Sequence, residues 1–141
     1  MQTSGLSLEQ APPLSIPARF FLAIPLGILA AAWVMLTSVA AAFGSPWTPQ
    51  SVALTHAGTL GVLAMGMCGA LYQMTPVVAG SPIPLPRLAH AVFALMLAGQ
   101  AGFMWRLTGG TEVSKAFAMV CFAIALPAFL LPLVWVLVRP A

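Results

Sequence analysis

Four long apolar segments, separated by short polar stretches rich in Pro and Gly, fill most of this chain and constrain its fold more than any other feature. Of the 141 residues, 61% are apolar and only 5% are charged. A helix of roughly 20 apolar residues crosses a hydrocarbon core about 30 Å thick, so four crossings use most of the length. The sequence therefore predicts an all-α integral membrane four-helix bundle, a single domain in contact with membrane lipid.

Proline and glycine mark the ends of the expected helices. We expect a polar N-terminal tail over residues 1–16 and a transmembrane domain over 17–141, with spans at about 17–43, 49–78, 87–106 and 112–138. Gly44 should end the first span, and Thr48 and Pro49 suit the N-cap and first turn of the second. Because all the connections are short, neighbouring helices are expected to be antiparallel.

Five basic residues, found near both ends of the expected spans, bear on the orientation of the chain. Arg19, Arg87 and Arg139 fall on one side of the membrane, and Arg106 and Lys115 fall on the other. By the positive-inside rule, three basic residues against two favour a topology with both termini on the cytoplasmic side of a bacterial inner membrane. The net charge of +3 comes from scattered residues with no basic cluster, so no nucleic-acid partner is expected.

His56, near the start of the second span, is the residue best suited to chemistry. An ionisable side chain inside a membrane is costly, so it usually has a partner: a metal, a haem iron or a fixed hydrogen bond. The structural alternative is a neutral imidazole bonded to a backbone carbonyl or to Gln100. Gln100, at a similar height in the third span, could orient a metal-bound imidazole through its second nitrogen, or simply bond across helices.

His90, early in the third span, is the only other histidine. It could be a metal ligand or an interfacial histidine that faces headgroups. At about 1.5 Å of rise per residue, the His56 and His90 side chains should differ in height by roughly 15 to 20 Å. Two imidazole nitrogens on one iron are about 4 Å apart, since metal–imidazole bonds are near 2 Å. One chain is therefore not expected to complete a bis-histidine site.

Sulfur-containing residues of the second span offer another metal chemistry. Met65, Met67, Cys68 and Met74 are soft ligands of the kind that suit Cu(I). Methionine also serves as a flexible packing residue, and a membrane-buried cysteine is commonly a small apolar one. A copper site is therefore kept as the less favoured interpretation.

Small residues of the second and third spans favour close contacts. Gly58 and Gly61, with Ala57, lie near His56, and Ala98 and Gly102 have the small-xxx-small spacing in the third span. Such residues allow another helix, or a flat macrocycle, to approach closely. They are compatible with assembly into a dimer or a trimer.

The second span also resembles a known helix. Residues 54–65, LTHAGTLGVLAM, and 69–76, GALYQMTP, are similar to helix two of the haem-copper oxidase catalytic-subunit superfamily. In that family a histidine early in this helix, near the outer face, is an axial ligand of the low-spin haem, and His56 stands at the matching place. The twelve-helix subunit of the family consists of three four-helix arcs. This chain resembles one arc, which implies a homo-oligomer.

The chain also departs from the family pattern. It has no second histidine two residues from His56 and no histidine pair on its third span. A complete oxygen- or nitric-oxide-reducing centre within one chain is therefore not expected, and whether the protein is an enzyme stays open. The resemblance implies that Arg106 and Lys115 could pair with haem propionates. Alternatively, both are ordinary interfacial charges.

Together these features predict a membrane protein that binds haem b through His56, for electron transfer or for binding a gas. The second axial ligand would come from a neighbouring subunit or be absent, and a redox partner is implied. A cofactor-free accessory or transport subunit of a membrane complex is the main alternative. A copper-handling membrane protein is the third.

Overall fold

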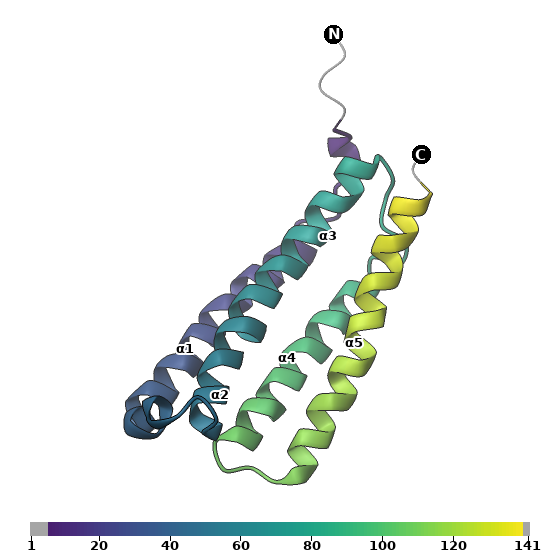
Figure 1. Ribbon diagram of the computed structural model, residues 1–141. Coiled ribbons are helices and arrows are strands. Elements are labelled where there is room, and N and C mark those ends of the chain that lie inside the picture. The colour runs from purple at the N-terminus through teal and green to yellow at the C-terminus, as the bar shows by residue number, and fades with distance from the viewer. Residues whose placement is uncertain (1–5, 140–141) are drawn as a thin grey trace.

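The structure is a computed structural model that describes residues 6–139. Within this range all regular elements are helical (Figure 1). They are the 3-10 helix η1 (Leu8–Gln10), α1 (Ser15–Gly44), α2 (Pro49–His56), the π-helix η2 (Ala57–Ala64), α3 (Met65–Ala79), α4 (Leu88–Leu107) and α5 (Glu112–Val138). Because α2, η2 and α3 follow one another without a break, the chain forms four helical segments that are long and apolar enough to span a membrane. The predicted four-helix membrane architecture is confirmed at this level.

The helices associate as two pairs. In one pair α1 packs along α2, η2 and α3, and in the other α4 packs along α5 (Figure 1). The pairs meet where α3 contacts α5 and where α4 contacts α1, α2 and η2. The connection 80–87 lies at the end of the molecule that carries η1, which we call the η1 end. The connections 45–48 and 108–111 lie at the other end, which we call the Trp47 end.

Aromatic rings join the two pairs in the core. Phe20 of α1 and Tyr72 of α3 are almost fully buried, at 0% and 1% exposure. The Tyr72 ring lies 5.6 Å from Phe20 and 5.2 Å from Phe129 of α5, and Phe20 lies 5.3 Å from Phe93 of α4. Each long helical segment therefore contributes to this aromatic cluster, which supplies much of the buried apolar area at the junction.

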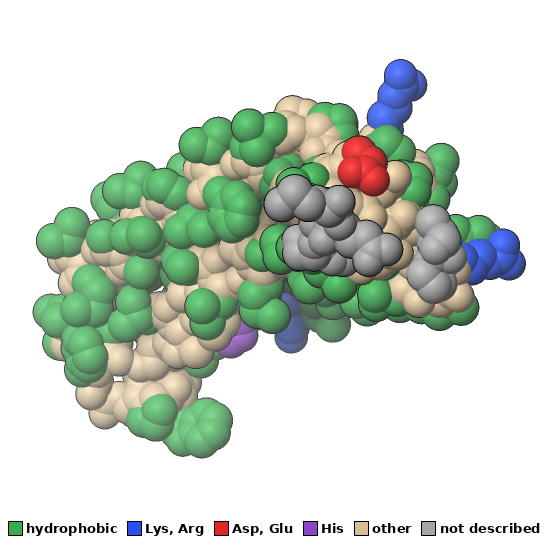
Figure 2. Space-filling view, turned by 90° about the horizontal axis from the view of Figure 1, so that it is seen from above, with side chains coloured by type: hydrophobic (Ala, Val, Ile, Leu, Met, Phe, Trp, Pro, Cys, Tyr) green, Lys and Arg blue, Asp and Glu red, His purple; other side chains and the backbone are tan. Residues whose placement is uncertain are grey.

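The outer surface is apolar. Large hydrophobic side chains such as Leu22, Leu36 and Leu131 are 76%, 84% and 69% exposed. Figure 2, which views the molecule from the η1 end, shows hydrophobic side chains around the visible outline and charged side chains at only a few points. So much exposed apolar surface is incompatible with water and is what a lipid environment requires.

The connection between α1 and α2 is held by hydroxyl groups. Thr48 caps α2 as expected, accepting a hydrogen bond from the Ser51 backbone N–H at 3.2 Å, with Pro49 in the first turn. The Thr48 hydroxyl also lies 2.7 Å from the Ala41 carbonyl, and the Ser51 hydroxyl lies 2.7 Å from the Ser45 carbonyl. These bonds tie the start of α2 to the end of α1.

Two backbone irregularities were not expected from the sequence. Ser38 in α1 has non-helical angles (φ −148°, ψ 32°), so the last part of this helix bends away from its axis. The π-helix η2 begins directly after His56. Neither irregularity lies at a proline, although Pro25 lies within α1.

Candidate functional site

The imidazole of His56 is oriented by its own helix. His56 is the last residue of α2 and is half-buried, and its Nδ1 lies 2.8 Å from the carbonyl oxygen of Val52, one turn earlier. A carbonyl only accepts, so Nδ1 carries a proton, and in the neutral imidazole Nε2 therefore keeps its lone pair. This is the tautomer in which a histidine binds a metal through Nε2, with its other nitrogen fixed by a backbone carbonyl.

Phe103 of α4 provides the second contact of this ring. The centroids of the His56 and Phe103 rings are 5.0 Å apart, with an edge-to-face angle of 66°. The packing restricts rotation of the imidazole beyond what the hydrogen bond alone would do. Together the two contacts hold the ring where α2 changes into the π-helix, a type of backbone that is frequent at functional sites.

Gln100 does not orient His56, because Val52 already accepts the Nδ1 proton. It lies instead against Gly61 of η2, where an added Cβ would overlap the Gln100 Nε2 and would lie 2.8 Å from the Cα of Gly27. Gln100 is 7% exposed. None of the side-chain hydrogen bonds within residues 6–139 involves it. Its place is therefore a tight crossing of α1, η2 and α4.

Gly58 and His90 have different surroundings. Apart from its chain neighbours and the backbone of its own helix, no atom lies within 4 Å of the position that a Cβ would take on Gly58, so this side of η2 is open. His90 lies in the first turn of α4, at the end of this helix that points towards the η1 end, whereas His56 is the last residue of α2, the helix that begins at the Trp47 end. The His90 Nδ1 is buried and has no hydrogen-bond partner in the described part of the chain. The structure does not bring the two histidines together.

Arg106 and Lys115 converge on Glu112 in the first turn of α5, which was not expected to be their partner. The Arg106 Nε donates to Glu112 Oε1 at 2.9 Å, and a second guanidinium nitrogen contacts the same oxygen. The Lys115 Nζ lies 3.7 Å from Glu112 Oε2. All three are substantially exposed at the Trp47 end. The i, i+3 spacing of Glu112 and Lys115 was the available signal.

The four sulfur-containing residues of the second span do not converge. Met65 and Cys68 are buried at 1% and 6% exposure, whereas Met67 and Met74 are 62% and 53% exposed on the outer surface. Among the described residues no group of three or more His, Cys, Asp or Glu side chains is placed to hold a metal ion. Met65 and Cys68 instead form part of the apolar core.

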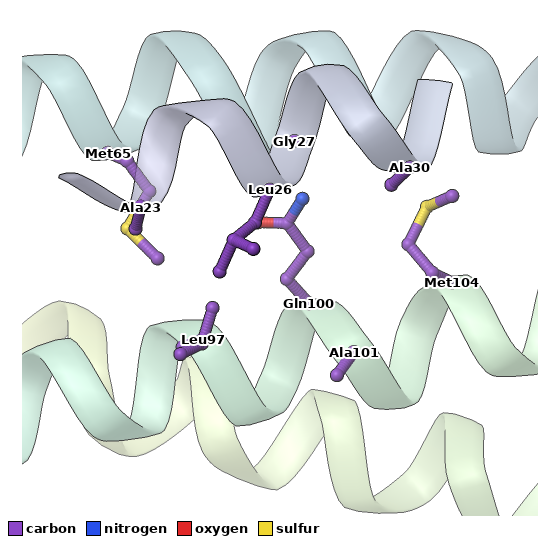
Figure 3. Close-up of a pocket in the computed structure, with 9 residues that line it drawn as sticks. All are labelled: Ala23, Leu26, Gly27, Ala30, Met65, Leu97, Gln100, Ala101 and Met104. Atoms are coloured by element: carbon purple, nitrogen blue, oxygen red, sulfur yellow. The ribbon is translucent and has the colours of Figure 1, made fainter. Parts of the chain in front are cut away.

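A cavity of about 210 Å³ lies between α1 and α4 and was not expected from the sequence. Its lining comes from α1, α3 and α4, and consists of Ala23, Leu26, Gly27, Ala30, Met65, Leu97, Gln100, Ala101 and Met104. Figure 3 shows the Gln100 side chain extending from α4 towards α1, with its amide beside Leu26 and Gly27. The small residues of α1 at 23, 27 and 30, spaced four and three apart, were the sequence signal for this cavity.

The cavity and His56 allow a test of the fit to haem. A cavity of about 150 Å³ holds one benzene ring, so one of 210 Å³ cannot enclose a four-ring macrocycle. His56 is also not among the residues that line this cavity. In its neutral form His56 has a nitrogen that suits an iron ligand, but a macrocycle bound to it would have to lie outside the Gln100 cavity.

Comparisons with known proteins do not extend this picture. No family model matches the chain, and searches of curated proteins and of solved structures return no match. What the protein does is therefore inferred from its own residues.

Proposed function

We propose that this protein binds haem b in the membrane, with the Nε2 of His56 as an axial ligand, and that it transfers electrons or binds a gas. The observation that carries the proposal is the hydrogen bond from His56 Nδ1 to the Val52 carbonyl, which in the neutral imidazole leaves Nε2 as the nitrogen with the lone pair. The Nε2 lone pair of a neutral imidazole is what a haem iron binds, whereas the hydrogen bond to Val52 by itself is also the one expected of the structural alternative. The resemblance of the second span to helix two of the haem-copper oxidase catalytic subunits is consistent with this role.

The second axial ligand would come from a second copy of the chain. His90 lies on another helix and towards the opposite end, so it is not placed to serve the iron held by His56. In a two-fold dimer each residue near the axis faces its own equivalent, so two His56 side chains can approach one haem from opposite faces. A trimer would instead leave each iron with one histidine.

The chain's own residues would control this site. The Val52 carbonyl and the Phe103 ring fix the orientation of the imidazole. The apolar walls of the helices would exclude water and so set the reduction potential of the iron when haem is bound. Arg106 and Lys115 form ion pairs with Glu112 at the Trp47 end. There they could bind the haem propionates, which would replace the Glu112 carboxylate as their partner. Antiparallel helices, with both termini on the cytoplasmic side of a bacterial inner membrane, complete the proposal.

Visible spectra of the purified protein test it. We expect the wild type, expressed with ample haem and purified in detergent, to show a reduced b-type spectrum with one haem for every two chains. His56→Ala should lose the haem, whereas His90→Ala, a matched change of the other histidine, should keep it. A wild type without haem, or haem retained in full by His56→Ala, would overturn the proposal.

A cofactor-free accessory subunit of a membrane complex is the second candidate, and the crossing at Gly27 and Gly61 favours it. A Cβ on Gly27 would lie 2.6 Å from the carbonyl carbon of Gly61, so the two backbones are already in direct contact. Such packing stabilises a helix bundle without any ligand. A colourless wild type would support this candidate. The outward positions of Met67 and Met74 leave the copper-handling interpretation without geometric support.

A further inference from the structure

The cavity between α1 and α4 has features of a ligand site that haem binding at His56 does not use. Its volume of about 210 Å³ exceeds the roughly 150 Å³ that holds one benzene ring and is below the range of about 300 to 1,000 Å³ typical of sites for larger organic ligands. The size therefore selects a single six-membered ring with few substituents.

Gln100 gives the cavity its polarity. Of the nine residues that line the cavity, it is the only one with an amide, hydroxyl or charged side chain (Figure 3). Its side chain is 7% exposed and takes part in none of the side-chain hydrogen bonds found within residues 6–139. An amide that lines an apolar cavity and has no protein partner can donate a hydrogen bond to a ligand there or accept one from it, and this bond would favour binding. An amide both donates and accepts, so a hydroxyl group suits either end of it.

The cavity is reached from the lipid side. Leu26 and Ala101, which line it from α1 and α4, are both exposed on the outer surface of the bundle. The surrounding surface is apolar, so the ligand must itself dissolve in the bilayer before it enters. A charged ligand is excluded, because no charged side chain lines the cavity.

We propose that this cavity binds a membrane-dissolved, uncharged monocyclic ring that carries one hydroxyl group, with the ring held by the small residues and the sulfur-containing side chains and the hydroxyl bonded to the Gln100 amide. Methionine side chains make favourable contacts with aromatic rings, and Met65 and Met104 both line the cavity. This site is independent of His56.

Fluorine NMR of 4-fluorophenol with the full-length protein in detergent tests the proposal, with 4-fluorotoluene as the ring of equal size that lacks the hydroxyl. We expect saturable binding of both, with 4-fluorophenol bound about 3- to 10-fold more tightly, the effect of one hydrogen bond. Gln100→Leu should abolish this preference while keeping the binding of 4-fluorotoluene. Gln100→Met, which is unbranched, provides a second variant if the first does not fold.

Filling the cavity gives the complementary measurement. Ala30→Leu combined with Ala101→Leu should weaken the binding of both probes at least 10-fold, whereas Ala94→Leu, on an exposed part of α4 outside the cavity, should leave it unchanged. His56→Ala should bind both probes like the wild type, whether or not haem binds at His56. Binding that does not saturate, that shows no preference for the phenol, or that survives filling of the cavity would mean that acyl chains or detergent occupy the space, and would overturn the proposal.

Discussion

Gly61 and Gly58 lie three residues apart in η2 and have opposite surroundings. A Cβ on Gly61 would overlap the Gln100 amide and would lie 2.8 Å from the Gly27 Cα, whereas no atom lies within 4 Å of a Cβ on Gly58. We expect Gly61→Ala to lower the free energy of unfolding by about 1 to 3 kcal/mol, the usual cost of overpacking. Gly58→Ala should be neutral or should stabilise by up to about 1 kcal/mol. Unfolding by SDS in mixed micelles measures the free energy of unfolding of both variants. Equal changes in the two variants would contradict the close contact of Gly61 with Gly27 and Gln100.

Substitution of Tyr72 by Phe is expected to stabilise the protein, whereas most core substitutions destabilise it. Its ring is packed between Phe20 and Phe129, but its hydroxyl is buried and has no hydrogen-bond partner among residues 6–139. Removal of an unsatisfied buried hydroxyl relieves a desolvation cost, so we expect Tyr72→Phe to raise the free energy of unfolding by about 1 kcal/mol. Phe20→Ala, which removes a ring from the same cluster, should lower it by about 3 to 5 kcal/mol. A loss of stability in Tyr72→Phe would show that the hydroxyl has a partner.

Residue types and their heights in the membrane identified His56 as the side chain to examine, but not its neighbours. Height along a helix follows from the rise per residue, so the sequence placed Gln100 and His56 in one layer. Contact also requires the two side chains to point towards each other around their helix axes. The π-helix after His56 changes that angle for the rest of the span, and Gln100 lies on Gly61 instead. This is why one of the two roles considered for Gln100, a hydrogen bond to His56, is not found among residues 6–139.

At the scale of elements, the residues that cap or break helices predict most of the helix boundaries. The observed spans Ser15–Gly44, Pro49–Ala79, Leu88–Leu107 and Glu112–Val138 lie within two residues of the expected ones at each end. Caps and prolines act within one turn, so their effects are readable from the sequence. The bend at Ser38 and the π-helix have no such local signal, because they depend on how α1 packs against η2 and how its end meets α2.

The connection between α1 and α2 can be tested through its hydroxyls. Thr48 caps α2 and also bonds to the Ala41 carbonyl at the bent end of α1. We expect Thr48→Val to lower the free energy of unfolding by about 1 to 2 kcal/mol, since it removes a cap and a bond between two helices. Thr55→Val is the control, because the Thr55 hydroxyl is exposed and bonds only to the Ser51 carbonyl of its own helix. Equal losses in the two variants would contradict a special role for this connection.

At the scale of the whole molecule, composition was enough to predict a membrane protein of four helices but not the way the helices pair. The aromatic cluster at Phe20 and Tyr72 joins the two pairs, while α1 and α4 separate enough to leave the Gln100 cavity. Each helix is apolar over most of its circumference, since one side faces lipid and another faces its neighbours. Hydrophobic periodicity therefore cannot tell these sides apart, and small residues are the better guide to contact.

Basic residues at the helix ends give a prediction for the orientation of the whole molecule. Arg19, Arg87 and Arg139 belong to helix ends on one side, and the positive-inside rule predicts that this side is the cytoplasmic one. In a background with Cys68→Ala and Cys121→Ala, both buried positions, single cysteines can be introduced at two exposed connections: Thr111→Cys at the Trp47 end and Pro82→Cys at the η1 end. A membrane-impermeant maleimide added to spheroplasts should label the first and should reach the second only after the membrane is permeabilised. Total labelling after denaturation controls for expression. The reverse pattern would place His56 and the Arg106–Glu112 pair near the cytoplasmic face, where a haem at His56 would have to exchange electrons with a cytoplasmic partner instead of an external one.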